Sequence, residues 1–381
     1  MIKRLLILSL IMIPFYEVFL YFFIPGRNFP FFPDMRYTKD FVSLGASIAI
    51  GSTVLCRYGF KKLNNIWVPI FLLFVVWNMY KAPTGFIVNN VDFSGVWNYK
   101  PAYQLFVYLF LFLGVSNIPN INVDKILKVM SWCGFAMSVL MLMQYFGLDQ
   151  IFSILPEKII GSTKHPEMGG TIGQATLSAP FIVMCLPFMI HRGKLFLSLV
   201  MATAIVLSGS SFAMLGLVVV CMCSILASKK INNLLLLPVI LGCIFFVLLN
   251  KDFLFSNGRF DMWKLVISDI STGKICLTGA GIGAFKYLFA MKNGNQWYHA
   301  HNEYLQLVWS CGFVGAAICL MIVKDYVFTI FRSDRDNNLA IFISVLGIAV
   351  ISFGTFPLQL AVYQFYLTVM AGIVYSNNNG G

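Results

Sequence analysis

Long apolar segments alternate with short polar ones along almost the whole chain. A helix that crosses a bilayer needs about 20 mostly apolar residues, and runs of roughly that length recur from end to end. We predict about twelve spans, at 5–24, 41–56, 66–80, 102–116, 127–148, 174–190, 195–208, 212–227, 234–249, 303–323, 339–356 and 361–375. The pattern therefore predicts an all-α polytopic membrane protein, since a membrane β-barrel would show shorter segments of alternating hydrophobicity.

The composition agrees with a chain embedded in a membrane. Hydrophobic residues make up 59% of it and charged residues only 11%, whereas about a quarter of an ordinary soluble domain is charged. The nine cysteines lie mostly inside apolar runs without a CxxC pair, so we interpret them as small apolar residues. We expect a membrane-embedded protein and no nucleic-acid partner.

The placement of the charges gives an orientation. Basic residues fall in the short loops that the positive-inside rule assigns to the cytoplasm, together with Lys3 and Arg4. Both termini are then cytoplasmic. The opposite face also carries many cations, which indicates an anionic partner such as a lipid-linked phosphate; attraction to anionic lipid headgroups explains them equally well.

One long polar segment interrupts the pattern at about 250–302, between the predicted ninth and tenth spans. Loops of this length in compact proteins are usually functional. We predict a single membrane domain over 1–375 with this loop embedded in it, and a disordered tail at 376–381. No internal repeat is visible, which weakens the case for a transporter.

Within the loop, apolar residues at helical spacing predict an amphipathic helix over 259–271, lying at the membrane interface. Arg259 falls in its first turn, where backbone N–H groups favour an anion and a guanidinium can bind two phosphate oxygens. The alternative is an arginine whose charge reaches the membrane surface, and position alone favours it.

A glycine-rich turn, Gly279-Ala-Gly281-Ile-Gly283, follows. Such turns can bind phosphate with backbone amides. Neither a preceding strand nor an acidic residue at the required distance accompanies it, so it is not a dinucleotide fingerprint. Close helix approach through glycine is the favoured alternative.

Two histidines stand where the loop meets the next apolar segment. His299 and His301 would point to different faces of a helix, and His299 with Glu303 gives only two ligands, so we predict no metal site and no cofactor. Proton transfer suits these histidines better, because the pKa of an imidazole lies near neutrality.

The residues around His301 resemble a known family. His301-Asn302, followed after nine residues by Gly312-Phe-Val-Gly315, is similar to the periplasmic-loop signature of the bacterial O-antigen ligase and polymerase superfamily. The order of Arg259, Trp263 and the Gly279–Gly283 turn resembles that family too, as does the predicted topology.

The resemblance implies transfer of a glycan from undecaprenyl pyrophosphate to an acceptor sugar, at the periplasmic face of the bacterial inner membrane, by a metal-independent inverting enzyme. His301 would be the catalytic base and Arg259 would hold the pyrophosphate. Other candidates for substrate binding are Lys264, Lys164, His165, His299, Asn302, Glu303 and Gly281.

One departure from the family is clear. Its members commonly carry an arginine in a turn that reads Ser208-Gly-Ser-Ser211 in this chain. Either Lys164, His165 or Lys264 supplies the second cation, or the enzyme works with one. Ser210 and Ser211 could bind phosphate, although a capping role is more usual. The signature favours a ligase acting on a lipid A–core acceptor over a polysaccharide polymerase. A flippase or transporter is an alternative of a different class, and an interaction protein without activity is another.

Overall fold

The structure is a computed structural model of the whole chain. It describes residues 1–23, 35–59, 69–70, 72–74, 76, 87–88, 91–92, 96–148, 168, 170–172, 174–227, 237–238, 240–242, 258–271, 277–285, 289, 299–332 and 336–378. The described part is predominantly helical, and its one pair of strands consists of the two-residue β1 (Ile87–Val88) and β2 (Val91–Asp92), which pair antiparallel.

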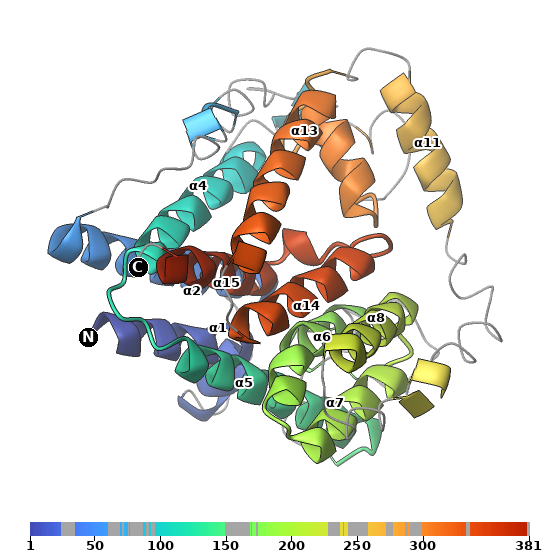
Figure 1. The fold of residues 1–381 in the computed structure, drawn as a ribbon. Helices are drawn as coiled ribbons and strands as arrows, with labels where there is room; N and C mark the ends of the chain where they lie inside the picture. The colour runs from blue at the N-terminus through green and yellow to red at the C-terminus, as the bar shows by residue number, and fades with distance from the viewer. Residues whose placement is uncertain are drawn as a thin grey trace. The chain divides into compact units, whose positions relative to one another are not determined.

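The helices follow the apolar segments closely (Figure 1). Their bounds are α1 Ile2–Phe23, α2 Met35–Tyr58, α4 Val96–Ser116, α5 Val123–Tyr145, α6 Ala175–His191, α7 Leu195–Leu207, α8 Ser211–Ala227, α11 Arg259–Ser271, α13 Glu303–Arg332, α14 Asp336–Ile351 and α15 Ala361–Asn378, with a 3-10 turn η4 at Pro357–Gln359. Most predicted segments are thus confirmed as helices. The predicted spans 66–80 and 234–249 lie for the most part outside the described residues.

Among the described helices, those long and apolar enough to cross a membrane are Lys39–Tyr58 of α2, α5 and α13. Shorter apolar helices accompany them, including α6, α7 and α8. These helices support a membrane protein, as the sequence predicts.

The chain forms two compact units. The first comprises Met1–Ala46, Asn120–Leu254 and Ser333–Met370, and the second comprises Ser47–Pro119, Phe255–Arg332 and Ala371–Gly381. The single membrane domain expected over 1–375 stays a prediction. Helix α15 continues to Asn378, so residues 376–378 of the expected disordered tail are helical. Ser376 Oγ donates to the carbonyl of Ile118 at 3.4 Å, which ties this end of the helix to the second unit.

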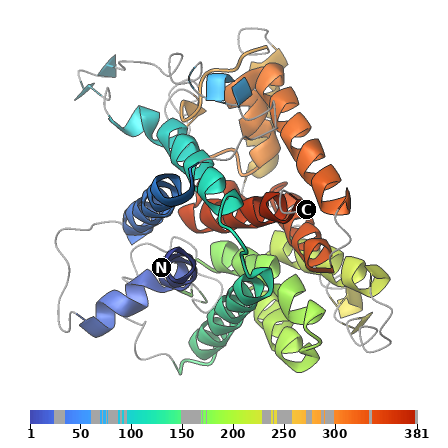
Figure 2. The same ribbon diagram turned by 60° about the vertical axis from the view of Figure 1, so that its left-hand side comes forward.

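In the first unit, α5 to α8 pack together in both views (Figure 1 and Figure 2), and α14 packs on α6 and α8. Pro14 breaks α1 because proline has no N–H to donate to the carbonyl of Leu10. The Tyr366 hydroxyl donates to that carbonyl at 2.6 Å instead, so α15 compensates for the lost helical bond. The side chain of Glu17, three residues beyond Pro14, lies outside the described residues.

In the second unit, α11 and α13 pack through an apolar cluster. Its buried members are Met262, Val266, Ile270, Ala284, Phe285, Phe289, Ala300 and Trp309. The Phe285 ring stacks on Phe289 with 4.6 Å between centroids and meets Trp309 edge-on at 5.0 Å. These aromatic contacts pack Phe285 and Phe289, which lie between the two helices in sequence, against Trp309 of α13.

Candidate functional site

Helix α11 begins at Arg259, as the sequence predicts, directly after Gly258, whose φ of +68° places it in the left-handed region. With 3.6 residues per turn, Trp263 lies on the same face as Arg259, one turn further on. Its indole Nε1 donates a hydrogen bond to the carbonyl of Ala300 at 2.9 Å. The face that carries Arg259 is therefore held against the segment that contains His301.

Both backbone polar groups of Ala300 are hydrogen-bonded to side chains. Its carbonyl accepts from Trp263, and its N–H donates to Oε1 of Gln306, on the first turn of α13, at 2.9 Å. Asn302 caps the same helix, because its Oδ1 accepts from the backbone N–H of Leu305 at 3.0 Å. Asn302 thus fixes the start of this helix, and its expected part in substrate binding stays a prediction.

His301 lies between these two fixed positions with a φ of +48°. Left-handed backbone is uncommon for residues other than glycine and costs free energy, so the surrounding hydrogen bonds must maintain it. Such outliers concentrate at functional sites. Because His301 has a left-handed backbone conformation, the direction of its half-buried imidazole is not set by the geometry of helix α13, which begins at Glu303.

Electrostatics link His301 to Arg259. Burial of the imidazole, the positive charge of Arg259 and the neighbouring His299 together lower the pKa of His301 from 6.5 to about 3, with burial the largest cause. Burial also lowers the pKa of the Arg259 guanidinium, which nevertheless stays protonated at neutral pH. The site thus combines a neutral imidazole with a nearby fixed cation.

The glycine-rich turn has a structural role. Helix α13 is broken at Gly312, where φ is 66° and ψ is −178°, which leaves carbonyls before the break without their helical donors. The backbone N–H of Ala280 donates to the carbonyl of Trp309 at 3.0 Å, and that of Gly281 donates to Ser310 at 2.8 Å. The amide of Gly281 is therefore engaged by α13, and the favoured alternative, close approach through glycine, describes this turn.

The approach leaves no room for a side chain. A Cβ on Gly279 would lie 2.2 Å from the carbonyl oxygen of Ser310, and one on Gly312 would lie 2.3 Å from the carbonyl carbon of Leu277. At Gly315 it would meet the ring of Phe74 at 2.3 Å. Gly279, Gly312 and Gly315 thus allow close packing at these positions.

The other predicted substrate-binding residues differ in their distance from the site. His299 is half-buried and close enough to influence His301, and Glu303 is buried in the first turn of α13. Lys264 is separated from Arg259 by about 140° around α11. Its ammonium forms an ion pair with Asp261 at 3.3 Å, and its side chain is 75% exposed. Lys264 therefore does not share the face of Arg259, and Lys164 and His165 lie outside the described residues.

Two positioning residues escaped prediction. The sequence gives Trp263 a place in the family resemblance and on an apolar helix face but no polar contact, and it indicates no role for Gln306. An amide in the first turn of an otherwise apolar helix was the available signal for Gln306. Helical spacing predicts an apolar face of Phe260, Trp263, Ile267 and Ile270 on α11. The structure instead buries Met262 and Val266 together with Ile270 and exposes Phe260 and Ile267.

The turn from Ser208 to Ser211, where the resembled family carries an arginine, is closed by the hydroxyl group of Ser208. Ser208 Oγ donates to the carbonyl of Ile205 at 2.6 Å and accepts from the N–H of Ser210 at 3.3 Å. Ser210 and Ser211 are both buried. The Ser208 hydroxyl thus closes the turn between α7 and α8, and the capping role expected of Ser210 and Ser211 stays a prediction.

Within the described part of the chain, no three His, Cys, Asp or Glu side chains lie close enough to hold a metal ion together. No protein-family model matches this sequence, and no curated protein matches it significantly. The functional assignment therefore depends on the motif and on the geometry around His301.

Proposed function

We propose that this chain is a membrane glycosyltransferase that moves a glycan from undecaprenyl pyrophosphate to an acceptor sugar, as an O-antigen ligase does. The proposal includes about twelve spans, cytoplasmic termini and a periplasmic loop at 250–302 that carries the site. The acceptor in this reading is a lipid A–core sugar, and a polysaccharide polymerase is the variant that uses the same chemistry on a growing chain.

The observation that carries the proposal is the electrostatic coupling of Arg259 to His301 across Ala300, whose backbone N–H and carbonyl are both hydrogen-bonded. The transfer of a glycan from a pyrophosphate requires a cation at the departing phosphates and a proton acceptor at the attacking hydroxyl. Arg259 and His301 supply these two groups, and Trp263 together with Gln306 holds them in register through Ala300.

In the proposed reaction, the acceptor hydroxyl oxygen attacks the anomeric carbon of the donor sugar, and the bond from that carbon to the pyrophosphate oxygen breaks. His301 accepts the hydroxyl proton, and the electron pair of the broken bond leaves with undecaprenyl pyrophosphate. Arg259 stabilises the charge that develops on the leaving group. Attack from the opposite side inverts the anomeric configuration.

A bound pyrophosphate would raise the pKa of His301. A base is most effective when its pKa lies near the working pH, and a value of about 3 is too low for that. The pyrophosphate would neutralise the charge of Arg259 and bring its own negative charge, and both changes raise the pKa of the imidazole. Substrate binding would then activate the base.

The test is a transfer assay with the full chain in proteoliposomes, a labelled glycan on undecaprenyl pyrophosphate and a lipid A–core acceptor. His301→Ala should lower the rate roughly 100- to 10,000-fold, the range for loss of a general base, with unchanged helicity by circular dichroism. His191→Ala, at the exposed end of α6, is the matched control. Near-normal turnover of His301→Ala, or glycan translocation without bond transfer, contradicts the proposal.

The glycolipid profile of a strain that lacks this protein separates the two enzyme variants. A ligase predicts that all polymer disappears from the lipid acceptor. A polymerase predicts that a single glycan repeat remains attached.

A further inference from the structure

A cleft of about 700 Å³ lies between α1 and the first half of α5, in the first unit. Ile11 and Phe15 of α1 form one wall. The other wall consists of residues of α5 that recur every three or four positions and so share one helix face. They are Lys125, Lys128, Val129, Trp132 and Ala136. None of these residues belongs to the site around His301.

The α5 wall changes character along the helix. Lys125 and Lys128 stand in its first two turns, and the positions that follow are apolar or aromatic. Ala136 is about 16 Å from Lys125 along the helix, at 1.5 Å per residue. Trp132, which is 47% exposed, lies between them, where a tryptophan suits the boundary between headgroups and hydrocarbon. The cleft thus has the polarity gradient of an amphiphile.

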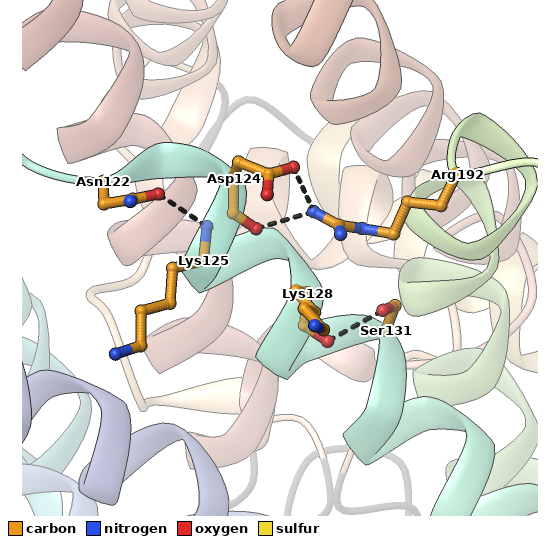
Figure 3. Close-up of polar contacts among 6 residues, drawn as sticks. All are labelled: Asn122, Asp124, Lys125, Lys128, Ser131 and Arg192. Carbon is orange, nitrogen blue, oxygen red and sulfur yellow. Dashed lines mark hydrogen bonds and ion pairs between the residues drawn. The ribbon is translucent and has the colours of Figure 1, made fainter.

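The basic end of the cleft keeps its positive charge. Arg192 forms an ion pair with the Asp124 carboxylate at 2.5 Å and donates to the Asp124 carbonyl at 2.6 Å. Figure 3 shows this pair, with the Lys125 ammonium extending away from it. Lys125 and Lys128 are exposed, and in the described part of the chain neither makes an ion pair. Asp124 is therefore neutralised by Arg192 rather than by the lysines.

The basic end is also rigid. Asn122 caps α5, and its Oδ1 accepts from the backbone N–H of Lys125 at 2.9 Å (Figure 3). Asp124, on the same turn, is held by Arg192 from the end of α6. The backbone that carries both lysines is thus fixed at two points.

We propose that this cleft binds one anionic glycerophospholipid of the surrounding membrane. The lipid phosphate lies between Lys125 and Lys128, and an acyl chain runs along Val129, Trp132 and Ala136 against Ile11 and Phe15. The volume falls within the range typical of small-molecule sites. Basic clefts between membrane helices recognise anionic headgroups in this way.

The test uses the quenching of tryptophan fluorescence by lipids brominated on their acyl chains. The full chain is reconstituted in vesicles of phosphatidylcholine and phosphatidylglycerol, with one lipid brominated at a time. The signal of Trp132 is obtained by difference from Trp132→Phe. Two lysines near a lipid surface correspond to a roughly 30-fold preference for the anionic lipid.

Lys125→Gln with Lys128→Gln should reduce that preference to near one, whereas Lys194→Gln, an exposed lysine outside the cleft, should leave it unchanged. Ala136→Phe fills the apolar part without a change of charge and should abolish quenching of Trp132 by the anionic lipid. Equal quenching by both lipids in the wild-type protein overturns the proposal. So does protection of Trp132 by inorganic phosphate, which indicates a soluble anion, or by increasing protein density, which indicates a second copy.

Discussion

The indole Nε1 of Trp263 and the carbonyl of Ala300 are joined by a hydrogen bond of 2.9 Å, which links helix α11 to the residue before His301. Arg259 lies one turn before Trp263, so this bond places the guanidinium relative to the imidazole. The N–H of Ala300 is bound separately by Gln306. The backbone of Ala300 therefore helps to position both proposed functional groups, Arg259 and His301.

Replacing Trp263 by Phe keeps the apolar packing and removes the donor. We expect a loss of about 1 kcal/mol in the free energy of unfolding, the usual value for one hydrogen bond. If Trp263 positions Arg259, kcat should also fall and the acid limb of kcat/KM should move to higher pH, because Arg259 would act less on His301. A stability loss with an unchanged pH profile would restrict Trp263 to a structural role.

Replacing Arg259 by Lys keeps the charge and removes the planar fork. We expect transfer to fall roughly 100- to 1,000-fold, the cost of losing a preorganised donor at a developing charge. The initial rate at saturating donor measures it. Arg57→Lys, the same change at an exposed position of α2, should retain full activity, and equal losses in the two variants would count against a specific role for Arg259.

The pH dependence follows from the lowered pKa of His301. Its neutral form dominates above about pH 3 in the free protein, so kcat/KM should not decline near pH 6.5 on account of this residue and should decline only toward the acid end. Arg259→Gln removes the second largest cause of the lowered pKa of His301. The pKa of His301 should then rise, and the acid limb of kcat/KM should move to higher pH. A wild-type limb at 6.5 that Arg259→Gln leaves in place would contradict this assignment.

Substitution of Gly312 in the α13 break, or of Gly279 in the turn that packs against it, should destabilise the second unit. Gly279→Ala and Gly312→Ala each combine a positive φ with a clash against backbone atoms, and we expect a cost of more than about 2 kcal/mol for each. Thermal unfolding in detergent measures it. Gly45→Ala, which has open space on helix α2, should be neutral or slightly stabilising, and similar melting of all three variants would rule out the proposed packing role.

Much of the local structure was predictable because it depends on local signals. The bounds of α11 follow from Gly258 and from the helical spacing after it, and the cap at Asn302 follows from its place before an apolar run. Arg259 and His301 were predicted to act together from their residue types and the motif, and the structure places them in one unit.

The rest depends on contacts between residues distant in sequence. Apolar residues occur on several faces of α11, so the sequence could not show that α13 would cover Met262 and Val266 rather than Phe260. The glycine-rich turn around Gly281 resembles a phosphate-binding loop in its residue types. It instead binds carbonyls of α13, which lack helical donors only because that helix is broken at Gly312. Lys264 was a candidate because of its charge, but helix geometry directs it away from Arg259.

The break at Gly312 also gives α13 two separate macrodipoles. The short segment from Glu303 to Cys311 has its positive end beside Asn302 and His301, and a helix dipole acts mainly within its first turn. That end favours a neutral imidazole over a protonated one and attracts phosphate oxygens, in the same sense as the charge of Arg259. The start of α13 at Glu303 thereby contributes a fixed partial positive charge where the proposed leaving group would depart, and the break lets the rest of α13 direct its own dipole differently.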